Sequence, residues 1–346
     1  MRQHISERVV TIGGGTGSFT MLSELKKVIA ENHLWSIVTM MDSGGSSRRL
    51  MDEFGRPLPL GDLRQALVAL SRRSRLWGDI FSYRFPDVVN EAVASVDGAD
   101  HVQSSNGHGS GNMSGHSLGN LILHALQDQN DGDLMGAIED AEELLNTAGH
   151  VLPVTVDQAT LCAELTDGTI IQGETEIDRA ENRIVLPIAR LYLDRPVRAT
   201  ARARKAIERA DRVIIGPGDL FTSVIPCLLV DGIKDALAAC DGELVYVCNV
   251  MTKYGETDNY RASDFVEQIH HYLGRRVDAV VVNTGTFPEE ALRRYQKAGS
   301  APVEADLPTL RQLVPRVITG NVASSEHLIR HDAERVVMAI WSDFTG

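Results

Sequence analysis

The chain has 346 residues, of which 43% are hydrophobic and 23% charged, and its formal net charge is −13. This balance is typical of a globular protein and excludes disordered and fibrous ones. The acidic charge argues against binding to nucleic acid or anionic membranes. No apolar run approaches the roughly 20 residues of a membrane helix, and from the polar amino terminus we expect no secretory signal. We expect a cytoplasmic protein whose four cysteines are buried, reduced thiols.

The amino-terminal part of the chain has the pattern of a βαβ unit. Two strand-like runs, 8–12 and 35–41, are separated by a segment with apolar residues at helical spacing, 18–30. Each run ends in a glycine-rich loop, at 13–17 and 42–47. Because a right-handed crossover brings the ends of parallel strands to one edge of a sheet, we expect both loops at the same edge.

The middle of the chain changes pattern twice. Apolar spacing between about 61 and 148 predicts a helical insertion, and period-two alternation between about 151 and 197 predicts a small antiparallel β segment. Asp167-Gly168 is a typical hairpin turn in that segment. The stretch 98–115, rich in Gly, Ser, Asn and His, predicts a loop whose role the sequence leaves open.

The β/α alternation returns towards the carboxyl end. Runs rich in Val at 212–215, 243–250 and 277–283 lead into loops rich in Gly, Asn, Thr and Asp. Near-continuous apolar strands are typical of a parallel sheet covered on both faces. No linker marks a boundary, so we predict one domain over 1–346. Its fold class is α/β, a Rossmann-like three-layer α/β/α arrangement with a mostly parallel sheet.

The first glycine loop has the composition of a phosphate-binding site. Glycines let backbone N–H groups approach phosphate oxygens, and the following helix adds the positive end of its dipole. The match to a dinucleotide fingerprint is incomplete, because Ser18 stands where a third glycine is expected. The alternative is a tight turn without a ligand. The candidate binding residues are Gly13, Gly14, Gly15, Thr16 and Gly17.

The second loop combines a carboxylate with glycines and hydroxyls. In a nicotinamide-binding fold its acidic residue would bond ribose hydroxyls. A carboxylate amid hydroxyls would also hold Mg²⁺ through water while the backbone holds phosphate. A plain surface turn is the alternative. The candidate ligand-binding residues are Asp42, Ser43, Gly44, Gly45, Ser46 and Ser47, with Asp42 as the candidate Mg²⁺ ligand.

Two helix starts carry further polar side chains. Asp62 is a natural N-cap, and Arg64, one turn into the helix, is placed to reach a ligand anion or to lie in solvent. His116 is a candidate phosphate donor or acid/base, and Asn120 a candidate positioning amide.

A third strand-to-helix loop follows the run 212–215, and the next strand adds an amide and a hydroxyl. Loops from several strands converge at the topological switch point where open α/β sheets bind ligands. Each loop taken alone fits a turn, but together they predict a site. The candidate binding residues are Gly216, Gly218, Thr222, Ser223, Asn249 and Thr252.

Six sequence blocks occur in order between about residues 8 and 335. They are TIGGGTGSFTMLSELKK, MMDSGGSSRRLMDEFGRPLPLGDLRQALVALS, SGHSLGNLIL, GPGDLFTSVIPCLLVDGI, NVMTKYGETDNY and IRHDAE. Together they resemble the YvcK-like gluconeogenesis factor family, part of the broader CofD-like group named after 2-phospho-L-lactate transferase. Ser43 and Arg48 stand where that family usually has Asp and Gly, and Asp219 where it usually has Ser.

The resemblance implies a Rossmann-like fold, a homodimer and a ligand at the carboxyl edge of the sheet. It also implies binding of a nucleotide sugar, UDP-N-acetylglucosamine in particular, with a role in cell-wall precursor control. The transferase branch joins a guanylylated phospholactate to a deazaflavin and uses Mg²⁺.

Three functions remain open on the sequence alone. The first is a regulatory protein of carbon metabolism and cell-wall precursor supply that binds a nucleotide sugar without chemistry and acts on a protein partner. The second is a Mg²⁺-dependent transferase of the 2-phospho-L-lactate type that positions a nucleotide-activated donor. The third is an NAD-binding oxidoreductase, for which only His116 is a candidate acid/base.

Overall fold

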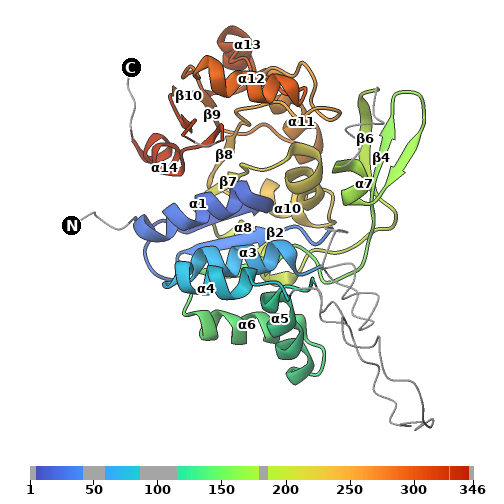
Figure 1. Cartoon of the computed structure of the whole chain (residues 1–346), viewed down its shortest axis with the longest axis vertical. Coiled ribbons are helices and arrows are strands. Elements are labelled where there is room, and N and C mark those ends of the chain that lie inside the picture. Colours follow the sequence, from blue (N-terminus) through green and yellow to red (C-terminus); the bar gives the residue numbers. More distant parts are fainter. Residues whose placement is uncertain (1–4, 42–58, 86–114, 179–185, 327, 343–346) are drawn as a thin grey trace, which may run out of the picture.

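A computed structural model describes residues 5–41, 59–85, 115–178, 186–326 and 328–342. Its centre is a seven-stranded sheet with the strand order β10-β9-β8-β7-β1-β2-β3 (Figure 1). All six neighbouring pairs of this sheet are parallel, which confirms the predicted fold class. The strands are β1 (Val9–Gly13), β2 (Leu34–Val38), β3 (His150–Pro153), β7 (Arg212–Ile215), β8 (Glu243–Val247), β9 (Ala279–Asn283) and β10 (Arg316–Gly320).

Helices cover both faces of the sheet. α1 contacts α3 and α14 in one layer, whereas α8 contacts α10 and α11 contacts α9 and α13 in the other (Figure 1). The helices are α1 (Gly15–Val28), α3 (Gly61–Leu70), α4 (Ser74–Ser82), α5 (Leu118–Gln129), α6 (Leu134–Leu145), α7 (Glu174–Asp178), α8 (Ala201–Glu208), α9 (Ile225–Leu228), α10 (Ile233–Ala238), α11 (Ala262–Leu273), α12 (Glu289–Lys297), α13 (Leu307–Leu313) and α14 (Ala333–Trp341). All five residues of β1 are buried, as expected for a strand covered on both faces.

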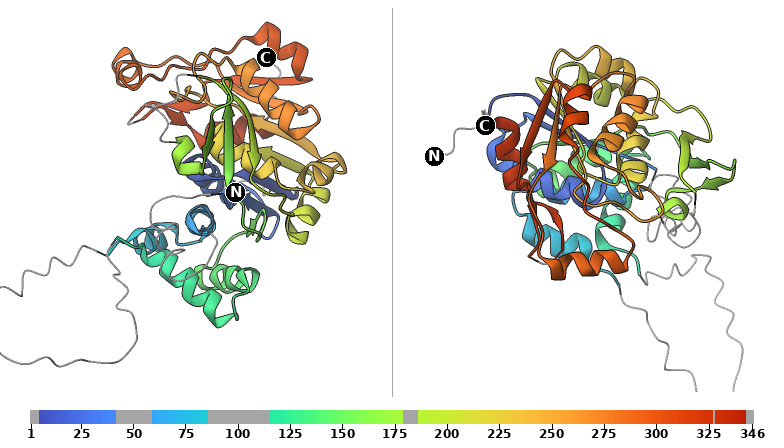
Figure 2. Two further views of the ribbon diagram at one scale, coloured as in Figure 1. Left: turned by 90° about the vertical axis from the view of Figure 1, so that its right-hand side faces the viewer. Right: turned by 90° about the horizontal axis from the view of Figure 1, so that it is seen from above.

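The antiparallel segment begins later than predicted. Its three strands, in the order β5-β4-β6, are β4 (Leu161–Leu165), β5 (Ile170–Gln172) and β6 (Ile188–Leu193). Figure 2 shows β4 and β6 standing to one side of the central sheet. The buried Tyr272 hydroxyl of α11 accepts a hydrogen bond of 2.7 Å from the Leu191 N–H, which ties this small sheet to the body. A further short pair joins β11 (Ala323–Ser324) to β12 (Arg330–His331).

The prediction that residues 151–153 belong to the antiparallel segment is wrong. They lie in β3, which pairs in parallel with β2 at the edge of the central sheet. This edge is protected against further strand addition, because the Val151 N–H donates to the Glu142 carboxylate at 2.6 Å and Pro153 has no N–H. The hairpin turn at Asp167-Gly168 is confirmed, with Gly168 at φ +85° between β4 and β5.

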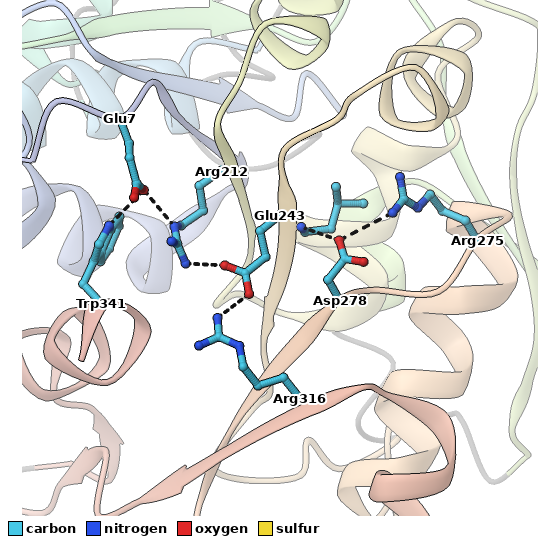
Figure 3. Close-up of polar contacts among 8 residues, drawn as sticks. Glu7, Arg212, Glu243, Arg275, Asp278, Arg316 and Trp341 are labelled. Carbon is cyan, nitrogen blue, oxygen red and sulfur yellow. Dashed lines mark hydrogen bonds and ion pairs between the residues drawn. The ribbon is translucent and has the colours of Figure 1, made fainter. Parts of the chain in front are cut away.

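A chain of polar contacts joins residues at the amino-terminal ends of β1, β7, β8 and β10 (Figure 3). Glu7 accepts hydrogen bonds of 3.0 Å from the Arg212 guanidinium and from the Trp341 indole N–H. The Glu243 carboxylate forms ion pairs with the guanidinium groups of both Arg212 and Arg316. These contacts fix the strand starts at the edge of the sheet opposite the glycine loops.

Candidate functional site

The loops at the carboxyl ends of β1, β7 and β8 surround a common cavity of about 380 Å³. This volume lies within the usual range for small-molecule sites. The predicted binding residues that line it are Gly14, Gly15, Thr16, Gly17, Gly218, Ser223, Asn249 and Thr252. Gly13, Gly216 and Thr222 belong to the same loops but are not among its lining residues.

The first loop turns directly from β1 into α1. Gly14 is the N-cap of α1 and has no side chain to cap it, and no acidic residue lies in the first helical turn. Gly15 has φ +69°, a left-handed conformation that favours glycine. A Cβ at Gly15 would have only the Ser223 hydroxyl nearby, at 3.6 Å. Gly15, Thr16 and Gly17 of the first turn of α1 line the cavity, so the positive end of the helix dipole lies beside it, an arrangement that suits anions.

Glycines also bring the first and third loops into backbone contact. A Cβ on Gly17 would lie 2.6 Å from the Pro217 carbonyl oxygen, and one on Gly218 would lie 3.2 Å from the Gly14 carbonyl oxygen. The Asn249 amide then donates to the Gly218 carbonyl at 3.0 Å. Loops from β1, β7 and β8 are thus joined into one wall of the cavity.

Asp62 contributes to the glycine loop instead of capping its own helix. α3 begins at Gly61 with Leu60 as its N-cap, so the prediction of Asp62 as N-cap is wrong. The Asp62 carboxylate accepts a hydrogen bond of 3.0 Å from the Gly15 N–H. A Cβ on Gly14 would lie 2.2 Å from the same carboxylate, so the close approach depends on that glycine.

Lys253 forms ion pairs with three carboxylates at one side of the cavity. Its ammonium group lies 2.8 Å from Glu256 and 3.0 Å from Asp219, and it also pairs with Asp178 of α7. Burial lowers the pKa of Lys253, but Glu256 and Asp219 outweigh it and hold that pKa above its ordinary value. The Glu256 side chain is only 2% exposed, and burial raises its pKa to about 7 despite the lysine.

This cluster is missing from the sequence-based set of binding residues. Lys253 and Glu256 lie in the loop after β8, where a polar site was expected, and the spacing of three residues is compatible with an ion pair. Asp178 is 75 residues away in sequence, so no local pattern predicts its contact with Lys253.

The remaining wall comes from α12 and β12, near the carboxyl end of the chain. Tyr295 donates to the Ile329 carbonyl at 3.1 Å, and the His331 ring lies 2.9 Å from the Cys248 carbonyl. Burial lowers the pKa of His331. Arg330 also lines the cavity and is exposed. Within the part of the chain that the structure describes, Arg330 makes no ion pair.

Three predicted residues lie where α3, α4 and α5 meet, and they do not line the cavity. Arg64 donates to the Phe81 carbonyl at 3.1 Å. His116 and Asn120 are 1% and 2% exposed. The Asn120 N–H donates to the Ser117 hydroxyl, which caps α5. Their roles in binding stay predictions.

The second predicted loop, Asp42 to Ser47, lies outside the described residues, and so does most of 98–115. Among the residues that are described, no group of three or more His, Cys, Asp or Glu side chains could hold a metal ion. A Mg²⁺ ion bound through Asp42 therefore stays a prediction. In the same part of the chain, none of the helices is both long and apolar enough to cross a membrane.

The parallel sheet, with glycine loops and a cavity at its carboxyl edge, defines a Rossmann-like α/β protein. The chain belongs to the family described as 2-phospho-L-lactate transferase CofD, whose profile matches residues 9–323. It is also similar over nearly its whole length to proteins named gluconeogenesis factor. That of Halalkalibacterium halodurans is 36% identical and that of Bacillus subtilis 34% identical, over 337 and 332 residues. These alignments cover 96% and 95% of this chain, and 95% of each relative.

A solved structure has the same fold. It is the crystal structure of a UPF0052 family protein from Bacillus halodurans, 35% identical, with a TM-score of 0.84. The match covers 97% of this chain and 100% of that one. The resemblance inferred from the six sequence blocks is confirmed.

Proposed function

We propose that this protein is a cytoplasmic regulatory protein of the gluconeogenesis factor type that binds a nucleotide sugar resembling UDP-N-acetylglucosamine. The observation that carries the proposal is the joining of three polar loops around one cavity, with the amino-terminal end of α1 directed at it. The positive end of the α1 dipole, beside Thr16 and Gly17, suits a diphosphate. Arg330 supplies a cation at the same cavity.

The sugar and its hydroxyl groups would meet polar side chains that line the same cavity. Asp219, Asn249 and Thr252 provide acceptors and donors there, as hydroxyl recognition requires. Lys253 partly neutralises the carboxylates next to the phosphate-binding end. The names of the full-length relatives support a role as a factor in carbon metabolism, and we propose that bound ligand alters affinity for a protein partner, with a homodimer as the working state.

Among the described residues, no buried thiol is a candidate nucleophile at the cavity, because neither Cys227 nor Cys248 lines it. Burial raises the pKa of Cys227 and of Cys248 above the ordinary value of a thiol, which removes their nucleophilic form. A second candidate function is a transferase of the CofD type, in which Mg²⁺ near Asp42 would neutralise donor phosphates. It is favoured by the family match and by Glu256, because a carboxyl with a pKa of about 7 at the cavity suits a general base.

Calorimetric titration distinguishes these functions. The protein is titrated with UDP-N-acetylglucosamine, GDP and NAD, each with and without Mg²⁺, and ³¹P NMR follows the ligand afterwards. The proposal expects the nucleotide sugar to bind most tightly and to remain unchanged. Preference for GDP with strong Mg²⁺ dependence, or consumption of the nucleotide, would support the transferase, and preference for NAD would contradict both.

A further inference from the structure

A second cavity, of about 580 Å³, lies at the end of the central sheet opposite the glycine loops. Trp35 is the second residue of β2 and His150 the first of β3, so this cavity lies at the amino-terminal ends of the strands. α6 and α8, which contact β3, form its walls (Figure 1). No residue that lines it lines the first cavity.

The floor of the second cavity is aromatic. The rings of Trp35 and His150 stack with their centroids 5.9 Å apart and their planes 27° apart. Ile138, Leu152 and Ala206 add aliphatic surface. Both aromatic residues are only half-buried, although most of the sheet around them is covered. A flat, partly exposed ring surface between aliphatic walls suits a planar apolar group.

One wall is basic, because three Lys and Arg residues on α8 and just after it lie on a single helix face. Arg202, Lys205 and Arg209 line the cavity at spacings of three and four residues. Arg202 pairs with Glu139 across the cavity. Lys205 and Arg209 make no ion pair with any residue that the structure describes.

The acidic residues of the cavity already have partners. Glu139 pairs with Arg202, and Glu142 lies 3.0 Å from the His150 ring while it accepts from the Val151 N–H. The hydrogen bond with Glu142 raises the pKa of His150. The cavity is therefore left with a positive charge, in a chain whose formal net charge is −13.

The edge strand excludes an extended peptide as the occupant. The outward N–H of Val151 is used by Glu142, and the Pro153 carbonyl accepts a hydrogen bond of 3.0 Å from the Thr200 hydroxyl. Strand addition needs free backbone groups at the edge, so the cavity favours a small molecule.

We propose that the second cavity is a separate binding site for a small planar anion, an aromatic ring that carries a carboxylate, sulfonate or phosphate group. The ring stacks on Trp35, and Lys205 and Arg209 hold the anionic group. This site is independent of the nucleotide site, and it goes beyond the proposed function.

Naphthalene-2-sulfonate is a suitable probe, because it joins a planar ring to one anionic group. Calorimetry measures its binding to the parent protein, to Lys205→Ala/Arg209→Ala and to Trp35→Leu. The control is Arg204→Ala/Lys234→Ala, which removes the same charge outside the cavity. We expect measurable binding to the parent, at least tenfold weaker binding to the first two variants, and a change of less than twofold in the control.

The probe is titrated again in the presence of saturating UDP-N-acetylglucosamine. Unchanged probe affinity is expected, since the two cavities share no lining residue. No binding to the parent at millimolar probe, equal binding to Lys205→Ala/Arg209→Ala, or displacement by the nucleotide sugar would overturn the proposal. The double variant changes exposed side chains only, so the test holds even where Trp35→Leu fails to fold.

Discussion

The Asp62 carboxylate accepts a hydrogen bond of 3.0 Å from the Gly15 N–H, so a negative charge lies against a backbone donor that faces the first cavity. A bound phosphate near this donor would be repelled by the carboxylate, at a cost of about 1 kcal/mol for a solvated pair. Asp62→Asn removes the charge and keeps an oxygen that can accept the hydrogen bond. We expect calorimetry to show roughly fivefold tighter binding of UDP-N-acetylglucosamine, the equivalent of that energy.

The melting temperature of Asp62→Asn serves as its control, because an unchanged value shows that the loop is intact. Weaker binding by an intact variant would contradict repulsion and would make the carboxylate part of the ligand-binding machinery.

Arg330 is predicted to contribute to nucleotide binding through its charge. It lines the first cavity and makes no ion pair within the described residues, so its guanidinium is available for a phosphate. Charge-assisted hydrogen bonds contribute about 1.5–3 kcal/mol, so Arg330→Ala should weaken the binding of UDP-N-acetylglucosamine at least tenfold. Arg311→Ala, an exposed arginine outside the cavity, is the matched control. Equal affinities for both variants would remove Arg330 from the site.

Glu256 is predicted to make the stability of the protein depend on pH. Burial raises its pKa from 4.5 to about 7, so the folded state binds this proton more tightly than the unfolded state does. The free energy of unfolding should therefore fall as the pH rises between about 4.5 and 7. The contribution of this group corresponds to roughly 3 kcal/mol.

Glu256→Gln tests this contribution, because glutamine is neutral at every pH. Chemical denaturation at pH 5 and pH 8 should show a smaller loss of stability in the variant than in the parent. The same loss in both proteins would assign the pH dependence to other groups.

The polar chain at the amino-terminal edge is predicted to stabilise the fold (Figure 3). Glu243 lies between Arg212, 13% exposed, and Arg316, 41% exposed. Glu243→Ala leaves the buried guanidinium of Arg212 with one carboxylate fewer and should lower the free energy of unfolding by about 2 kcal/mol. Glu304→Ala breaks a pair that is 60% and 69% exposed and should cost less than about 1 kcal/mol. If urea denaturation gave the same loss of unfolding free energy for Glu243→Ala as for Glu304→Ala, the polar chain would add no more stability than an exposed ion pair.

The fold was predictable where short-range pattern decides the structure. β1, β7 and β9 are β-branched runs bounded by loop residues, and their type follows from the sequence. β3, with the sequence HVLP, has only one β-branched residue, and its place in the central sheet depends on pairing with β2 more than 100 residues earlier. A four-residue strand is too short for its hydrophobic pattern to indicate that β2 is its partner.

The candidate site was predictable in its backbone and less so in its side chains. The glycine loops are recognisable in the sequence because a left-handed backbone conformation, such as that of Gly15 at φ +69°, favours glycine. The pairing of Lys253 with Asp178 is set by the tertiary structure. Arg64 has the local context of an anion-binding arginine, yet its guanidinium donates to the Phe81 carbonyl between helices.

The role of the first glycine loop in nucleotide binding is tested most directly by comparing two glycine-to-alanine variants. Gly15→Ala and Gly274→Ala both place a side chain at positive φ, +69° and +76°, with no atom closer than 3.6 Å to the new Cβ. Each should lose about 1–2 kcal/mol of stability. Calorimetric titration with UDP-N-acetylglucosamine should show binding at least tenfold weaker for Gly15→Ala than for the parent, and parent-like binding for Gly274→Ala. Parent-like binding by both variants would contradict a phosphate site at this loop.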